Sequence, residues 1–299
     1  MKKSRLGFSL IEISIVILII GVLVIGITKG SRIIYEARVK SARALTNSSP
    51  IASMHDLVLW LDTTNPANLG IGTVASPTYS NNNPSDTDFV AYWKDRNPQS
   101  SGQKVLSAAG DNTRPTYFKN GIGGLPSLNF DGTSDYLSLG TGAITAGRSN
   151  YTTIIVFKMT GSTNVWIITQ GGSNCNGDSA SINLYNNANF NFIGCGVGGI
   201  ADATAGQITK LNVPYYAMIK MNKNLPSNKL TFYLNSQVGS ANPDTSNPIG
   251  GTTFIIGSRF GGSNYFQGLI SEVVVFDRAI SDSEINMIKD YFYKKYGIK

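Results

Sequence analysis

Residues 268–285 read GLISEVVVFDRAISDSEI, a strand pattern that passes directly into the start of a helix. Residues 270–276 are apolar on both faces near their end, as in a strand that is covered on both sides. Ser281 and Glu284 have the spacing of a capping box, in which each side chain accepts a hydrogen bond from the other residue's backbone N–H. A stripe at helical spacing follows, formed by Ile285, Ile288, Phe292 and Tyr296. The stretch predicts a buried strand and a short C-terminal helix that packs on its sheet.

Further short apolar runs precede this stretch, and Asn, Gly, Pro and Ser clusters separate them. The runs are residues 57–61, 153–157, 165–168, 215–221, 230–234 and 254–256. Charged residues make up only 14% of the chain, and it contains 32 glycines, which suit tight turns. Because many strands follow one another without an intervening helix, we expect an antiparallel β-sandwich rather than a parallel sheet.

The N-terminal segment has a different character. Residues 8–27 contain a single charge, at Glu12, and a helix of that length spans the ~30 Å hydrocarbon core of a bilayer. This run is longer than the apolar core of a cleaved secretory signal, which has about 7–15 residues. Helical spacing continues to about Leu45, and Pro50 then ends the pattern. We expect one long hydrophobic helix that anchors the chain in a membrane.

Residues 2–12 (KKSRLGFSLIE) resemble the class III signal of type IV pilins and type II secretion pseudopilins. The resemblance implies that a prepilin peptidase cuts after Gly7 and methylates Phe8. It also implies that Glu12 faces the N-terminal amine of a neighbouring subunit, which agrees with the need of a buried carboxylate for a cation. The alternative for Glu12 is a side chain at the level of the lipid headgroups.

These patterns divide the chain into three parts. We expect a leader peptide at residues 1–7, a transmembrane and assembly helix at residues 8–50, and a sandwich domain at residues 51–299. The expected fold class is α+β, with a long N-terminal hydrophobic helix, an antiparallel β-sandwich and a short C-terminal helix.

The sandwich region carries a second resemblance, to the concanavalin A-like, laminin-G-like jelly rolls. Four segments carry it, at residues 93–95, 114–117, 130–137 and 268–281. The resemblance implies a jelly-roll fold. It does not define an activity, because that superfamily includes lectins, adhesion modules and glycanases.

Groups suited to catalysis are scarce in this sequence. The single histidine, His55, lies in the linker before the first strand, where we expect a solvated side chain. Of four glutamates, only Glu272 lies in a strand of the sandwich, and Ile270 and Val274 occupy the alternate positions beside it. A retaining glycosidase needs two carboxylates about 5–5.5 Å apart. We therefore expect a protein that is not an enzyme, although pairs of aspartates leave a membrane-tethered glycan-active enzyme as an alternative.

Two further pairs of residues are candidate sites. Asp131 and Asp135 offer hard oxygen ligands for calcium, which that superfamily often carries; no other cofactor is expected. The favoured alternative is a turn in which the aspartates accept hydrogen bonds from their own backbone. Cys175 and Cys195 lie in the part expected outside the cytoplasm, where a disulfide between them is favoured over two free thiols.

The charge balance bears on possible partners. The formal charge is +7, but Lys2, Lys3 and Arg5 lie in the expected leader, and a second basic group flanks the apolar run. No recognition motif accompanies this charge, so we expect no nucleic-acid partner. Aromatic residues that are candidates for stacking on a sugar are Tyr79, Trp93, Tyr117 and Tyr265, with the sandwich core as the alternative for each.

Together, these features predict a type IV pilin-like filament subunit that displays a lectin-like domain for adhesion or glycan binding. The expected partners are other pilin subunits, the prepilin peptidase and a surface glycan. The expected location is the bacterial inner membrane for the precursor, and then an extracellular pilus. The alternative is a pseudopilin of a type II secretion system in the periplasm.

Overall fold

A computed structural model describes residues 10–79, 84–161, 164–171, 179–184, 192–194, 201–203, 210–242, 253–260 and 262–299. The chain divides into two compact units, one up to Ser41 and one from Ala42 onward.

Helix α1 (Leu10–Asn47) makes up the described part of the first unit and continues into the second. Large apolar side chains along residues 10–27 are exposed, and this is the only helix among the described residues that is long and apolar enough to cross a membrane. The helix ends before the short 3₁₀ helix η1 (Pro50–Ser53), where Pro50 follows the capping residue Ser49. The predicted hydrophobic helix and its end near Pro50 are confirmed.

The described residues of the second unit form two antiparallel sheets of eight strands each, so the predicted β-sandwich is confirmed. The first sheet has the order β16-β15-β14-β9-β18-β7-β6, and β1 also pairs with β18. Its strands are β16 (Gln237–Ala241), β15 (Leu230–Leu234), β14 (Pro214–Asn222), β9 (Asn150–Met159), β18 (Gln267–Phe276), β7 (Ser127–Asp131), β6 (Thr116–Phe118) and β1 (Leu57–Asp62).

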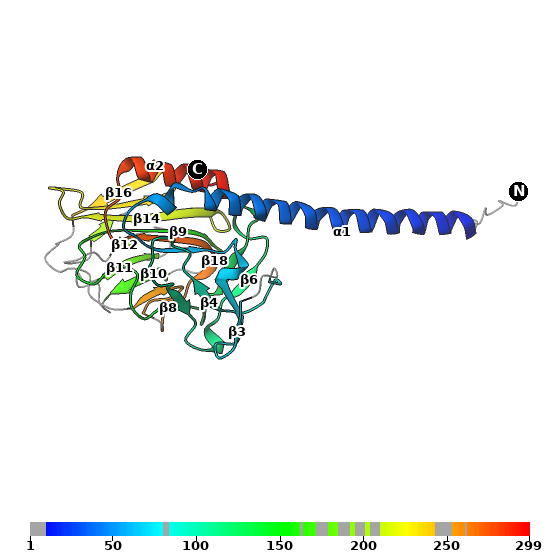
Figure 1. Cartoon of the computed structure of the whole chain (residues 1–299), viewed down its shortest axis with the longest axis horizontal. Helices are drawn as coiled ribbons and strands as arrows, with labels where there is room; N and C mark the ends of the chain where they lie inside the picture. Colours follow the sequence, from blue (N-terminus) through cyan, green and yellow to red (C-terminus); the bar gives the residue numbers. More distant parts are fainter. Residues whose placement is uncertain are drawn as a thin grey trace, which may run out of the picture. The chain divides into compact units, whose positions relative to one another are not determined.

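The second sheet has the order β11-β10-β17-β8-β5-β4-β2-β3 and lies below the first in Figure 1. Its strands are β11 (Ser179–Leu184), β10 (Val165–Gly171), β17 (Phe254–Ile256), β8 (Leu137–Leu139), β5 (Val105–Ser107), β4 (Val90–Lys94), β2 (Leu69–Gly72) and β3 (Pro77–Thr78). A separate pair is formed by β12 (Phe192–Gly194) and β13 (Ala201–Ala203). Single 3₁₀ turns in the connections are η2 (Pro66–Asn68), η3 (Asp111–Thr113) and η4 (Ile122–Gly124).

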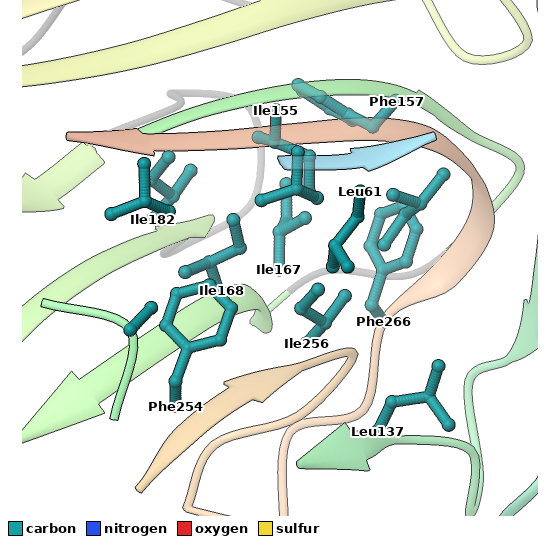
Figure 2. Packing of buried hydrophobic residues seen from close by; sticks show 14 of the residues in the cluster. Leu61, Leu137, Ile155, Phe157, Ile167, Ile168, Ile182, Phe254, Ile256 and Phe266 are labelled. Carbon is teal, nitrogen blue, oxygen red and sulfur yellow. The ribbon is translucent and has the colours of Figure 1, made fainter. Parts of the chain in front are cut away.

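The hydrophobic core lies between the two sheets. Figure 2 shows Ile155 and Phe157 of the first sheet above Ile168, Phe254 and Ile256 of the second. These side chains are almost completely shielded from solvent. Each contributes roughly 1.5–3 kcal/mol when moved from water into such a core, so this layer stabilises the stacking of the two sheets.

Helix α2 (Asp282–Tyr296) covers the outer side of the first sheet (Figure 1). The capping box is present, because Glu284 N donates to Ser281 Oγ and Ser281 N donates to Glu284 Oε2. The predicted stripe is buried, which confirms that this helix packs on the sheet. Two further residues of the helix, Tyr291 and Lys295, are also buried, and the hydrophobic pattern did not predict them.

Candidate functional site

The outer face of the second sheet carries a row of polar and aromatic residues, most of them half-buried, with Tyr79 exposed at its edge. In β4, Trp93 points into the core, so Tyr92 and Lys94 lie on the opposite face. Ser107 in β5 and Ser138 in β8 also lie on this outer face, because the residues on either side of each serine point into the core. The strand register places Tyr92 opposite both Gly70 and Ser107, and Ser107 opposite Ser138. We call Gly70, Tyr79, Tyr92, Lys94, Ser107 and Ser138 the tyrosine face.

Tyr79 is the most accessible aromatic residue of the tyrosine face. Its side chain is 39% exposed, and Lys94 Nζ lies 3.2 Å from the centroid of its ring. A methyl group added at Gly70 would lie 3.1 Å from Cε1 of Tyr79 and 2.9 Å from Cβ of Tyr92, so glycine leaves room for both rings. Partial burial and the neighbouring Tyr92 raise the pKa of Tyr79, so its hydroxyl keeps its proton.

Such a face has the chemistry that sugar binding requires. An exposed tyrosine ring offers an apolar surface against which a pyranose ring can stack, and its hydroxyl donates and accepts hydrogen bonds. Ser107 and Ser138 add neutral hydroxyls in the same row, and Lys94 adds a cation. The face thus combines stacking with neutral and charged hydrogen-bond donors.

The other aromatic candidates have different surroundings. Trp93 and Tyr117 are buried in the core, which confirms the alternative stated for them. Tyr265 is partly buried beside Tyr136, with 6.5 Å between the ring centroids. Phe118 is exposed on β6 of the first sheet, and the sequence analysis did not single it out.

Asp131 is the last residue of β7 and Asp135 lies in the loop that follows, where Asp131 organises the turn. Asp131 Oδ1 accepts from the backbone N–H groups of Thr133, Ser134 and Asp135, at 2.8, 2.9 and 3.1 Å. Its Oδ2 accepts from the hydroxyls of Thr133 and Ser134. In return, Asp131 N donates to Asp135 Oδ2 at 3.0 Å. These hydrogen bonds form a turn of the kind described above as the alternative to a calcium site.

The two aspartates differ strongly in acidity. Burial raises the pKa of Asp135 to about 7, and the neighbouring Asp131 carboxylate adds to the rise. Partial burial alone would raise the pKa of Asp131, but hydrogen bonds from Thr133, Ser134 and Asp135 outweigh it and lower the pKa to about 2. At neutral pH, Asp131 is ionised and Asp135 is close to half protonated.

A second group of titratable residues lies beneath α2. Lys295 Nζ is 2.8 Å from Asp62 Oδ1 on β1 and 2.8 Å from Glu272 Oε2 on β18. The side chains of all three residues are 0% exposed. We call Asp62, Glu272 and Lys295 the buried ionic cluster.

Aromatic donors surround the glutamate of this cluster. Trp60 Nε1 donates to Glu272 Oε1 at 2.8 Å, and Tyr296 OH donates to Oε2 at 2.8 Å. Tyr291 OH lies 2.9 Å from Oε1 and 3.1 Å from the hydroxyl of Thr46, near the end of α1. Burial, followed by the Glu272 and Asp62 charges, raises the pKa of both tyrosines, so they remain donors.

The other oxygen of Asp62 has its own partners. Asp62 Oδ2 accepts from the hydroxyl of Thr64 at 2.5 Å and lies 3.5 Å from Nη1 of Arg96. Burial alone would raise the pKa of Asp62, but Lys295, Thr64 and Arg96 outweigh it and lower the pKa. The arrangement therefore holds an ionised carboxylate without access to solvent.

Regular alternation along a single strand gives Glu272 no carboxylate partner, because Ile270 and Val274 occupy the alternate positions. The partner lies on the neighbouring strand, where Asp62 is in register with Glu272. A register shift between Ile270 and Glu272 also turns Ile270 toward the core and Glu272 toward α2. The capping box predicted α2, but no local signal marked Lys295 as its buried cation.

The remaining predicted site residues have separate positions. Glu12 lies in the first turn of α1, and the side chain of His55 is exposed, as expected. Gly7, Phe8, Cys175 and Cys195 lie outside the described residues. Within the described ranges, no three or more His, Cys, Asp or Glu side chains form a group that could hold a metal ion.

The family model described as the concanavalin A-like lectin/glucanases superfamily matches residues 131–286. A search of curated proteins by sequence found no match.

One similar solved structure is an arabinofuranosidase complexed with arabinofuranosyl-α-1,2-xylobiose; it is 13% identical with a TM-score of 0.56, and the match covers 82% of this chain and 64% of that chain. A second is a GH54 α-L-arabinofuranosidase soaked with a cyclic sulfate inhibitor; it is 13% identical with a TM-score of 0.55, and the match covers 80% of this chain and 63% of that chain. The binding domain of Paraclostridial Mosquitocidal Protein 1 is also similar, with 11% identity and a TM-score of 0.50, and the match covers 83% of this chain and 56% of that chain. The chain spans less than two thirds of each of these structures. At such identities, the likeness concerns the fold alone.

Proposed function

Because the chain belongs to the concanavalin A-like lectin/glucanase superfamily, we propose that it is a glycan-binding subunit of a type IV pilin-like filament. The helix α1 anchors the precursor in the bacterial inner membrane and then packs against other subunits. The sandwich is displayed outside the cell and binds a surface glycan without cleaving it.

The tyrosine face is the observation that carries the binding part of this proposal. Tyr79 is exposed beside Lys94, and the row continues through two serines on neighbouring strands. A single small face of this kind binds a sugar weakly, because few contacts offset the freedom that both partners lose. A filament with many copies compensates, since later contacts form at high effective concentration.

Two observations support binding without catalysis. The paired carboxylates Asp62 and Glu272 are shielded from any substrate. Asp131 uses both carboxylate oxygens within its own turn. The assembly part rests on the prepilin-like residues 2–12 and on the exposed apolar surface of α1.

Substitution of Tyr79 tests the binding face. We expect the full-length protein, reconstituted in liposomes at many copies per vesicle, to bind a subset of a glycan array. Tyr79→Ala should reduce this signal about two- to tenfold, since an aromatic stacking contact contributes about 0.5–1.5 kcal/mol. Binding by the detergent-solubilised protein at low density should be weak or undetectable.

Phe118→Ala is the matched control for this experiment, because Phe118 is 40% exposed, similar to Tyr79, but lies on the first sheet. Equal loss in both variants would contradict the tyrosine face as the binding site. Unchanged binding after Tyr79→Ala would contradict it as well, and no binding by any liposome would favour a purely structural subunit.

Substitution of Glu12 tests the assembly part. Glu12→Ala should leave membrane insertion intact, because it removes a carboxylate that costs about 2.5–3.5 kcal/mol near the membrane centre. It should strongly reduce the amount of protein in sheared surface filaments, measured by immunoblot against the membrane fraction. Ser14→Ala, two positions along the same helix, is the control. Normal incorporation of Glu12→Ala would contradict the pairing of this glutamate with a neighbouring subunit.

The alternatives predict different outcomes. A pseudopilin of a type II secretion system would give no surface filaments when cells are imaged with an antibody against the sandwich. A membrane-tethered glycan-active enzyme is favoured by one observation, the separated pKa values of Asp131 and Asp135. Release of sugars from arabinan or xylan that is lost in Asp135→Asn would establish that enzyme.

A further inference from the structure

We propose that Lys295 and Asp62 are joined by an intramolecular isopeptide bond, which forms within the buried ionic cluster after the sandwich folds. The bond would link the first strand of the sandwich to the last helix of the chain. This proposal is independent of the proposed function, because it rests on the cluster alone.

The geometry places the Lys295 amino group in hydrogen-bond contact with both carboxylates of the cluster. Lys295 Nζ lies 2.8 Å from Asp62 Oδ1 and at the same distance from Glu272 Oε2. Burial holds all three side chains in place without competing water. Such fixed approach replaces a bimolecular reaction with an intramolecular one, and effective molarities of about 10⁵–10⁸ M are known for well-oriented groups.

The two carboxylates have different surroundings, and these assign their roles. Glu272 is held by Trp60, Tyr291 and Tyr296, which fix it as a proton acceptor beside Nζ. Asp62 instead has the Thr64 hydroxyl and the Arg96 guanidinium on Oδ2. These donors stabilise negative charge on Oδ2 during attack at Cγ, as an oxyanion hole does. Asp62 is therefore the acyl group and Glu272 the proton shuttle.

The reaction is balanced within the cluster. The Lys295 ammonium gives one proton to Glu272, which passes it to Oδ1 of Asp62, and the freed amine lone pair attacks Cγ of this neutral carboxyl group to form a C–N bond. A second proton passes from the nitrogen to Oδ1, with Glu272 again as the carrier. The Cγ–Oδ1 bond then breaks and water leaves. An ammonium and a carboxylate become an amide and one water, and Glu272 is unchanged.

The protein interior favours this product over the ion pair. An ion pair removed from water carries a desolvation penalty that its mutual attraction offsets only in part. The amide is neutral, and the released water leaves to solvent. Glu272 keeps its hydrogen bonds from Trp60, Tyr291 and Tyr296, so the carboxylate that remains in the interior stays hydrogen-bonded.

Mass spectrometry of the unmodified full-length chain tests the proposal without relying on any variant. The protein is purified in detergent, reduced to open any disulfide, denatured, and its N-terminus determined. We expect an intact mass lower than the calculated mass by one water. Tryptic digestion should give one branched peptide that contains Asp62 and Lys295, with no cleavage after Lys295. A full calculated mass with two separate peptides overturns the proposal.

Substitutions identify the two residues that the isopeptide bond joins. Lys295→Arg and Asp62→Ala should each show the full calculated mass, and Glu272→Gln should show mainly the full mass because the proton shuttle is lost. Lys294→Arg is the matched control, because Lys294 is the preceding residue on the surface of α2 and pairs with Asp290. It should keep the loss of water. Loss of water that persists in Lys295→Arg, or a branched peptide that contains Glu272 in place of Asp62, overturns the assignment.

Discussion

At the scale of single residues, Asp135 couples the stability of the sandwich to pH. Its pKa is about 7 in the folded chain, above the ordinary value of 3.8. Between about pH 4 and 7, the folded state holds a proton that the unfolded state has released, so stability is greatest at the acidic end and falls as pH rises through 7. Asp135→Asn removes this titration and should flatten the profile, with a gain on the order of 3 kcal/mol at pH 8 relative to wild type. Urea unfolding at pH 5 and pH 8 measures the free energy of unfolding of wild type and Asp135→Asn. Equal pH dependence in these two proteins would contradict the role of Asp135.

Residue patterns predicted some side chains and missed others for identifiable reasons. The turn around Asp131 was predictable, since Asp and Gly at such spacing favour local hydrogen bonds to the backbone. Tyr79 and Trp93 were equivalent as candidates, because alternation alone does not tell which face of a strand is covered. Lys295 could not be predicted as buried, since its partners, Asp62 and Glu272, lie far from it in the sequence.

At the scale of elements, the start of α2 depends on one glutamate. Arg278 donates to both oxygens of Glu284, and its hydrogen bonds are the main cause that lowers the pKa of Glu284 to about 2. This carboxylate contributes stability above its ordinary pKa of 4.5, and the contribution is lost as pH falls from there through about 2. Glu284→Ala should cost about 1–2 kcal/mol at pH 7, as for other lost caps.

Asp290→Ala on the exposed side of the same helix is the control for Glu284→Ala. Its pair with Lys294 is exposed to solvent, and such pairs contribute about 0–1 kcal/mol. Thermal unfolding of the two variants at pH 7 and pH 3 separates them: the deficit of Glu284→Ala should shrink at pH 3. A deficit of the same size at both values would show that the carboxylate charge has no part in the cap.

The elements themselves were predictable to different degrees. The long strands β9, β14 and β18 and both helices have continuous apolar patterns or capping residues, and these patterns predicted them. Strands such as β3 (Pro77–Thr78) and β5 (Val105–Ser107) are too short to show the alternation of apolar and polar residues that marks a strand. They exist because neighbouring strands supply their hydrogen-bond partners, and the sequence does not show which strands are neighbours.

At the scale of the whole molecule, the order of strands was outside the reach of local patterns. The sandwich class followed from the number of strands and the absence of helices between them. The pairing of β1 with β18 did not, because only the folded sheet brings Leu57 opposite Phe276. The candidate site depends on the same information: the tyrosine face joins four strands, and the buried ionic cluster joins β1, β18 and α2.

The pairing of β1 with β18 also sets when the domain can form during synthesis. Three strands, β1, β7 and β9, all pair with β18. The pairing of β1 with β18 brings Trp60 and Glu272 together, although they are 212 positions apart in the sequence. A chain made from its N-terminus therefore holds most strands of the first sheet without β18 until residues 267–276 have emerged. Closing so long a loop is slow and costs chain entropy. The first sheet consequently cannot be completed before β18 has been synthesised, and a chain that ends before Gln267 is expected to stay unfolded with its apolar strands open to proteases.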